Sequence, residues 1–241
     1  MLKYILATCT VLAFGVSNLE AISAHAQADV QDTVIVTGSR ISRGGQGGGY
    51  NVYKRISADF MLVDIYYQSG TRDEAIRANE LRTMFNRLVA ADKANESIFL
   101  QGGSDYGRVP IETILFDEIL EDSYDSEDIN LFSLTLGIEV NGETNFDKVL
   151  ARGQAFLDAI PLSGRAEAYL DDTQYIGARN IKAHRPEILR GIAEEAAKLR
   201  EIFGPSDIYI DGFESKLETA TTGPLQLDVY LPYSISLTTK Q

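Results

Sequence analysis

The chain has 241 residues, 44% of them hydrophobic, and carries 22 Lys+Arg against 35 Asp+Glu, a formal net charge of −13. This composition is typical of one globular domain or two small ones, and the acidic excess argues against nucleic acid and anionic membrane surfaces as partners. Trp is absent and Cys occurs once, which excludes a disulfide scaffold and a cysteine metal site.

Residues 1–26 have the pattern of a secretory signal peptide. Lys3 precedes an apolar run over 4–16, and small residues lead to Ala24-His25-Ala26, the A-x-A pattern of a cleavage site. The apolar run is shorter than the ~20 residues that span a bilayer, and no longer run follows it, so we expect no integral membrane span. Cleavage after Ala26 would remove Cys9 and His25.

The segment 27–50 combines a short predicted strand with a predicted linker. Residues 32–41 read Asp-Thr-Val-Ile-Val-Thr-Gly-Ser-Arg-Ile, and five glycines follow within 44–49. Residues 37–44 also look like a nucleotide phosphate loop, but Ser42 stands in place of the middle glycine and the glycines that follow forbid the helix that would bind pyrophosphate. We therefore expect no cofactor.

Residues 32–41 closely resemble the TonB box that follows the signal peptide of many TonB-dependent outer-membrane receptors. In that family TonB captures the box by strand addition in the periplasm. The resemblance implies TonB as a partner, and as partner-binding residues Asp32, Val34, Ile35, Val36, Thr37 and Gly38. The chain is too short for a receptor, whose barrel of ~22 strands would use ~220 residues before any plug. Two alternatives stay open, a strand that pairs with the chain's own sheet and a disordered arm.

Alternating apolar residues and turn signals predict strands in the rest of the chain. The predicted strands are 59–68, 98–100, 111–116, 134–140, 166–170, 208–210 and 225–237. In the last of these the alternation passes Pro232 in phase, which favours a sheet edge or a bulge there.

Three helices are predicted from apolar stripes at helical spacing. The first runs to about Ala91 and starts at a capping box of Thr71 and Glu74. The second covers 146–160 and ends at Pro161, and the third has Pro186 in its first turn and Gly204 beyond its end.

This order of elements predicts a single α+β globular domain over 51–241, with two layers, a mainly antiparallel or mixed sheet and about three helices on one face. It resembles the periplasmic SIMPL-domain family over about 55–238, in the strand at 58–67, the helix start at 71–75 and the helix at 194–198 with its terminal Gly204. The resemblance implies a non-enzymatic envelope protein that self-associates, without a catalytic residue.

Candidate sites are few. A single remaining histidine, His184, permits no two-histidine metal site, and we expect it to be solvated or to cap a helix. Seven acidic residues within 117–128 predict a solvated loop, with a Ca²⁺ site as the alternative. Four tyrosines lie near the start of the predicted domain: Tyr50, Tyr53, Tyr66 and Tyr67. We expect them to be half-buried residues of strands, and the alternative is that they line a ligand cleft or a protein interface.

Three hypotheses about function follow. The first is a non-enzymatic accessory or scaffold protein of the Gram-negative periplasm, or one associated with the outer membrane, that acts through protein contacts and forms homo-oligomers. The second is an adaptor that interacts with TonB. The third is a hydrolase or a small-ligand-binding protein that uses acidic residues.

Overall fold

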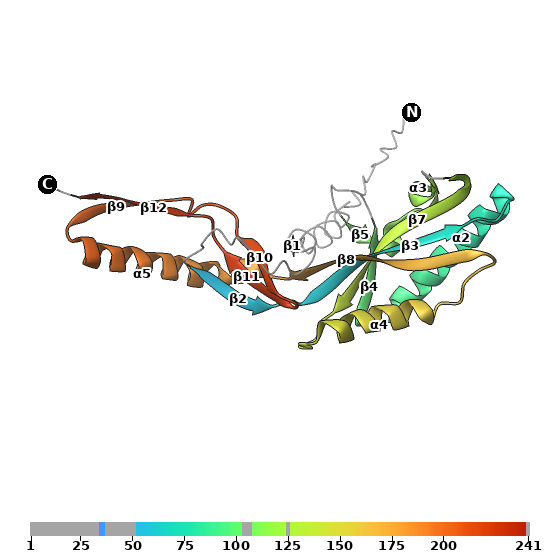
Figure 1. The fold of residues 1–241 in the computed structure, drawn as a ribbon, viewed down its shortest axis with the longest axis horizontal. Coiled ribbons are helices and arrows are strands. Elements are labelled where there is room, and N and C mark those ends of the chain that lie inside the picture. Colours follow the sequence, from blue (N-terminus) through green and yellow to red (C-terminus); the bar gives the residue numbers. More distant parts are fainter. Residues whose placement is uncertain (1–33, 37–51, 103–107, 124–125, 240–241) are drawn as a thin grey trace, which may run out of the picture.

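The protein is elongated in its computed structural model, which describes residues 34–36, 52–102, 108–123 and 126–239. A seven-stranded sheet with its helices lies at one end of the molecule (Figure 1). A long helix with a two-stranded sheet lies at the other end, and a three-stranded sheet lies between them.

The large sheet is antiparallel in every pairing and has the order β1-β8-β3-β7-β4-β5, with β6 pairing β7. Its strands are β1 (Val34–Val36), β3 (Phe60–Ser69), β4 (Ile98–Gly102), β5 (Val109–Pro110), β6 (Glu121–Ser123), β7 (Ser126–Glu139) and β8 (Ala166–Ala178). The connection from β5 to β6 contains η1 (Ile111–Thr113) and the short α3 (Phe116–Ile119).

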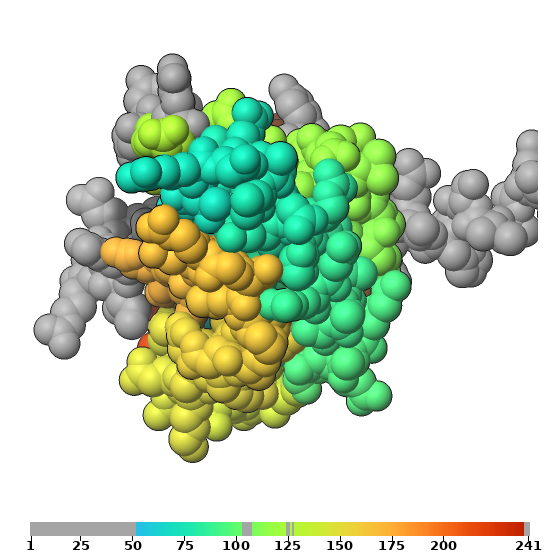
Figure 2. Space-filling model, turned by 90° about the vertical axis from the view of Figure 1, so that its right-hand side faces the viewer, coloured from blue at the N-terminus to red at the C-terminus, as the bar shows by residue number. Residues whose placement is uncertain are grey.

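One face of the large sheet is covered by α2 (Glu74–Lys93) and α4 (Phe146–Asp158). Seen from the end remote from the two-stranded sheet, the two helices lie beside the segment that joins α4 to β8 (Figure 2). Gly153 lets α4 approach β7 closely, because a Cβ atom there would come within 2.5 Å of Ile138 Cδ1.

The main core lies between these helices and the sheet. Alternate residues of β3 point into it, and they are fully buried: Met61, Val63, Ile65 and Tyr67. The register pairs Val63 with Leu136 and Ile65 with Leu134 of β7, which continue the same apolar layer. The alternation that predicted this strand therefore follows from one face being packed against helices.

The three-stranded sheet has the order β10-β11-β2 and is antiparallel. Its strands are β2 (Tyr53–Ser57), β10 (Glu218–Gly223) and β11 (Gln226–Tyr230). Arg55 of β2 donates two hydrogen bonds, of 2.8 and 3.0 Å, to the carboxylate of its cross-strand partner Asp228. Paired opposite charges of this kind stabilise the register of β2 on β11.

The far end of the molecule consists of α5 (Arg185–Phe203), which follows η2 (Ile181–His184), and of the antiparallel pair β9 (Ser206–Asp211) and β12 (Ser234–Thr239). We call α5, β9 and β12 the arm. Ile188, Ile192 and Ala196 of α5 are buried. The register pairs Ile210 with Ile235 and Ile208 with Leu237, and all four of these side chains stay half-buried, so the apolar layer of the arm is thin.

The α+β class with antiparallel sheets is confirmed, and the three predicted helices correspond to α2, α4 and α5. Two of them cover the large sheet, whereas α5 packs on β9 and β2. The extended segment predicted at 111–116 was wrong, because η1 and α3 occupy it. The strand predicted over 225–237 ends at Tyr230, and β12 begins beyond Pro232 and joins a different sheet.

Candidate interaction surfaces

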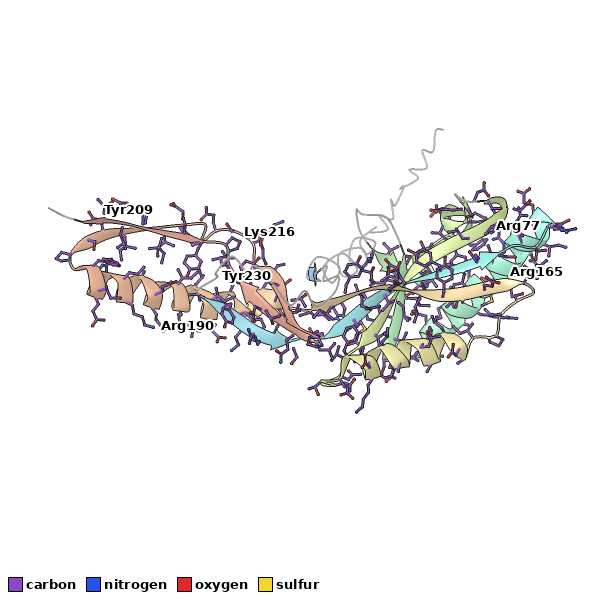
Figure 3. All side chains as sticks on the ribbon, viewed as in Figure 1. Arg77, Arg165, Arg190, Tyr209, Lys216 and Tyr230 are labelled. Atoms are coloured by element: carbon purple, nitrogen blue, oxygen red, sulfur yellow. The ribbon has the colours of Figure 1, made fainter. Side chains whose placement is uncertain are left out.

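The arm exposes large apolar side chains. Ile202 is 72% exposed and Phe203 is 56% exposed at the end of α5, and Tyr209 of β9 is 58% exposed. Figure 3 shows Tyr209 on the side of the two-stranded sheet that faces away from α5. Phe213, in the turn after β9, is 56% exposed. These side chains lie in the arm and in the turn next to it, and large apolar side chains that are this exposed are candidates for contact with a partner.

The second face of the large sheet, opposite α2 and α4, has an aromatic and charged cluster near the start of β3. The Phe99 ring meets Phe60 edge-on, with centroids 6.0 Å apart, and covers Gly137, where a Cβ atom would lie 2.1 Å from Phe99 Cζ. The Arg179 guanidinium lies 5.0 Å from the Phe60 ring centroid and donates to both carboxylate oxygens of Glu139 at 3.0 and 2.6 Å. Through these contacts the cluster stabilises the packing of the start of β3 against β4 and β7.

Further along the same face, two tyrosines lie near two aspartates. The Tyr66 and Tyr169 rings stack with centroids 5.1 Å apart, beside a bulge of β8 that contains Asp171. Asp64 accepts a hydrogen bond of 2.7 Å from Thr135. Burial raises the pKa of the Tyr66 hydroxyl, and the charges of Asp171 and Asp64 raise it further, so this phenol is a neutral hydrogen-bond donor at pH 7. The arrangement suits polar binding rather than nucleophilic attack.

Two surface hollows lie on the described part of the large sheet and its loops. One, of about 530 Å³, is lined by Val140, Asn141, Gly142, Glu143, Lys148 and Arg152. The other, of about 370 Å³, is lined by Gln68, Gly70, Ile129, Arg165, Ala166 and Glu167. Ligand pockets are mostly lined by apolar side chains, so these two polar linings are typical of solvated surface.

The structure places part of the predicted TonB-box segment at the edge of the large sheet. Val34, Ile35 and Val36 form β1, which pairs with Ala178, Gly177 and Ile176 of β8. Asp32, Thr37 and Gly38 lie outside the described residues. At 34–36 the chain thus adopts the alternative in which the segment pairs with its own sheet.

The acidic stretch was predicted as a solvated loop, and its described residues lie instead at the end of α3, in β6 and at the start of β7. Their acidic side chains are exposed to solvent, as predicted: Asp117, Glu118, Glu121, Asp122 and Asp128. Asp117 accepts a hydrogen bond of 2.5 Å from Arg82, and Asp122 accepts one of 2.6 Å from Asn130. In the described ranges, no three His, Cys, Asp or Glu side chains are grouped so that they could hold a metal ion.

The other predicted site residues are dispersed. His184 stands at the start of α5, where its side chain makes no capping hydrogen bond. Tyr53 lies in β2 and is 48% exposed, whereas Tyr66 and Tyr67 point to opposite faces of β3. Tyr50 lies outside the described residues. The described tyrosines therefore do not line one cleft.

Sequence reasoning missed the arm as a separate surface. The sequence does contain part of the information. Tyr209 alternates with Ile208 and Ile210, which places it on the opposite face of its strand, and Ile202 and Phe203 stand at the end of an amphipathic helix. Its exposure depends on which elements lie beside it in space, and the pattern of one segment does not contain that information.

Comparisons with protein-family models, with curated proteins and with solved structures gave no match. None of the helices in the described ranges has both the length and the apolar character needed to cross a membrane.

Proposed function

We propose that this chain is a non-enzymatic accessory or scaffold protein of the periplasm or outer membrane, which acts through protein–protein contacts and self-association. The observation that carries the proposal is the arm, with Ile202, Phe203 and Tyr209 more than half exposed on a thin two-layer structure. The location rests on the signal-peptide pattern of 1–26 and on the TonB-box resemblance.

The energetics of the arm support a partner. Complete burial of an Ile or Phe side chain stabilises a structure by ~1.5–3 kcal/mol, and the arm leaves this gain unused in the single chain. The half-buried residues between α5 and the two-stranded sheet add to the apolar surface that a partner could cover. The arm also lies at the end of the molecule remote from the large sheet, where a second protein has access to it (Figure 1).

Light scattering during size-exclusion chromatography tests self-association, at several protein concentrations. We expect the wild type to form oligomers and the double variant Ile202→Ser/Phe203→Ser to shift toward monomer. The matched control is Ile76→Ser/Leu162→Ser, which removes apolar side chains that are 51% and 52% exposed but lie outside the arm. A strict monomer that also retains no envelope protein on an affinity column would contradict the proposal.

A second candidate function is that of an adaptor that interacts with TonB. It is favoured by β1, which carries the TonB-box-like residues 34–36 and pairs over three residues only, at a sheet edge. So short a pairing at an edge is easily exchanged for pairing with another strand. Deletion of 32–41 should abolish capture of purified TonB, and unchanged capture would rule this function out. The hydrolase and small-ligand hypothesis gains no supporting arrangement from the described residues.

A further inference from the structure

The edges of the large sheet are protected against pairing with another chain. The outer side of β8 is occupied by β1 at 176–178, and further along it carries the bulge with Asp171 and Asp172. At the opposite edge, β5 has two residues, one of which is Pro110, and it covers Gln101 and Gly102 of β4. Beyond it, the Leu100 N–H of β4 donates to Asp92 at 2.6 Å. Bulges, charges, proline and short length are the features that keep sheet edges from pairing.

The edges of the three-stranded sheet are charged or covered. Lys54 and Arg55 lie in the edge strand β2, which also contacts α5. The other edge strand, β10, has a bulge between Thr221 and Gly223 and contacts β1. Charge therefore protects the edge at β2, and the bulge and the contact with β1 protect the edge at β10.

The two edges of the arm differ from each other. β9 carries Asp207 and Asp211, which would lie close to the same residues of a second β9 in an antiparallel pairing, and like charges there are unfavourable. β12 reads Ser-Ile-Ser-Leu-Thr-Thr over 234–239 and has neither a charged residue nor a proline. Among the described strands it pairs only with β9. It is therefore the described edge that lacks protection.

We propose that β12 is the self-association edge, at which the β12 strands of two copies pair antiparallel about a twofold axis and form a four-stranded sheet β9-β12-β12-β9. This inference rests on the proposed self-association and names the surface responsible for it. A twofold contact uses the same patch on both subunits, so the patch must match itself.

The alternation of β12 provides this match. Ile235 and Leu237 lie on one face, and Ser234, Ser236 and Thr238 lie on the other. A twofold axis perpendicular to the sheet keeps the same face of both copies on the same side, so apolar residues oppose apolar residues and hydroxyls oppose hydroxyls. The chain has a net charge of −13, and copies repel each other least where the edge is uncharged.

The pairing also remedies the thin core of the arm. Both α5 helices then lie side by side on the same face of the four-stranded sheet. There they cover the half-buried Ile235 and Leu237 of the two copies. Two-stranded sheets are marginal in water, and three or more strands with an apolar face are much more stable. The outward backbone groups of β12 acquire partners at the same time.

The test places a charge at the centre of this edge. Ser236 is exposed and points away from α5, so Ser236→Lys and Ser236→Glu leave the packing of the arm intact. Each variant alone brings two like charges together, and we expect the dimer dissociation constant to rise at least about tenfold, measured by sedimentation equilibrium. Mixing the two variants pairs opposite charges, so association should return to the wild-type level.

The matched control is Thr221→Lys. Thr221 is an exposed hydroxyl residue of an edge strand, but it belongs to β10, outside the arm, so we expect its substitution to leave the dissociation constant unchanged. Wild-type affinity in both Ser236 variants, or an equal loss in Thr221→Lys, overturns the β12 interface while self-association itself stands. A monomeric wild type overturns the proposed self-association, and this inference with it.

Discussion

Tyr67 places a hydroxyl group in the core of the protein. The side chain is 1% exposed, its ring stacks on Phe132 at 5.2 Å, and its hydroxyl has no hydrogen-bond partner among the described residues. Burial raises the pKa of this phenol to about 12. Because an unpaired buried hydroxyl costs about 1–3 kcal/mol, we expect Tyr67→Phe to increase the free energy of unfolding by about 1 kcal/mol in urea titrations.

Tyr209→Phe is the control for this substitution, since it removes an exposed hydroxyl and should leave the stability unchanged. A less stable Tyr67→Phe protein would contradict the prediction and show that the hydroxyl has a partner in solution.

Glu80 is a buried carboxylate in the second turn of α2 that accepts hydrogen bonds from three donors. It accepts hydrogen bonds from Ser69 Oγ at 2.6 Å, Thr71 Oγ1 at 2.9 Å and the Arg165 backbone N–H at 3.3 Å. Gly164 has φ +58°, and a Cβ atom there would lie 1.9 Å from Glu80 Oε1, so the turn before β8 requires glycine. Burial by itself raises the pKa of Glu80, but the donated hydrogen bonds outweigh burial and lower it overall.

This lowered pKa makes the stability dependent on pH. A carboxyl group with a lower pKa in the folded than in the unfolded protein stabilises the fold above its unfolded pKa, about 4.3 for Glu. The contribution is lost as the pH falls through the folded pKa. We expect Glu80→Gln to decrease the free energy of unfolding by about 1–3 kcal/mol at neutral pH. The difference from wild type should shrink below about pH 4.

Urea titrations at the two pH values measure this difference. Glu96→Gln, at an exposed position, is the control and should follow the wild type at both pH values. An equal effect of Glu80→Gln at both pH values would mean that the carboxylate charge is not what stabilises the network.

Thr71 shows where local sequence patterns mislead at the residue scale. Its spacing to Glu74 predicted a capping box, but Asp73 is the N-cap and accepts from the Ile76 N–H at 3.0 Å. The Thr71 hydroxyl donates to Glu80 instead. Thr71 and Asp73 are both residue types that can cap a helix. Asp73 caps α2 because the Thr71 hydroxyl is bound to the buried carboxylate of Glu80, in the second turn of the helix.

At the scale of elements, strong periodicity was a reliable guide and weak periodicity was not. α2, α4 and α5 follow the predicted apolar stripes, because each buries one face. β2 and β10 were not predicted, since charged and Thr-rich edge strands lack the alternation of a buried one. The apolar alternation does continue across Pro232, but the residues before it belong to the three-stranded sheet and those after it to the two-stranded sheet. The sequence pattern of a segment does not indicate which sheet the segment joins.

The contact between β4 and β7 on the second face should contribute strongly to stability. The Phe99 ring covers Gly137 and packs on Phe60 and under Arg179, so its removal uncovers both neighbouring strands. We expect Phe99→Ala to decrease the free energy of unfolding by about 2 kcal/mol in urea titrations. Phe203→Ala is the matched control at a low protein concentration, because Phe203 is 56% exposed. Equal effects of the two substitutions would contradict this role of Phe99.

At the scale of the whole molecule, the class of fold could be predicted and the arrangement could not. The order of strands and helices indicates an α+β protein, as found. The separation of α5, β9 and β12 from the large sheet depends on contacts between segments far apart in the chain, such as β9 with β12. The β12 edge could not be predicted for the same reason. A strand forms the edge of a sheet when no other strand pairs with its outer side, and this depends on the arrangement of the whole chain.

The difference in packing between the two ends predicts unequal local stability. β3 lies between β7 and β8 over a deep core, whereas the arm has a thin apolar layer and its two strands pair, among the described strands, only with each other. In hydrogen–deuterium exchange read by mass spectrometry, we expect the amides of β3 and β7 to exchange last and those of the arm much earlier. Raising the protein concentration should slow exchange in β12 more than in β9, because pairing between copies covers the outward amides of β12 and leaves the outer edge of β9 open. Exchange in β12 that does not depend on concentration would show that this edge stays free.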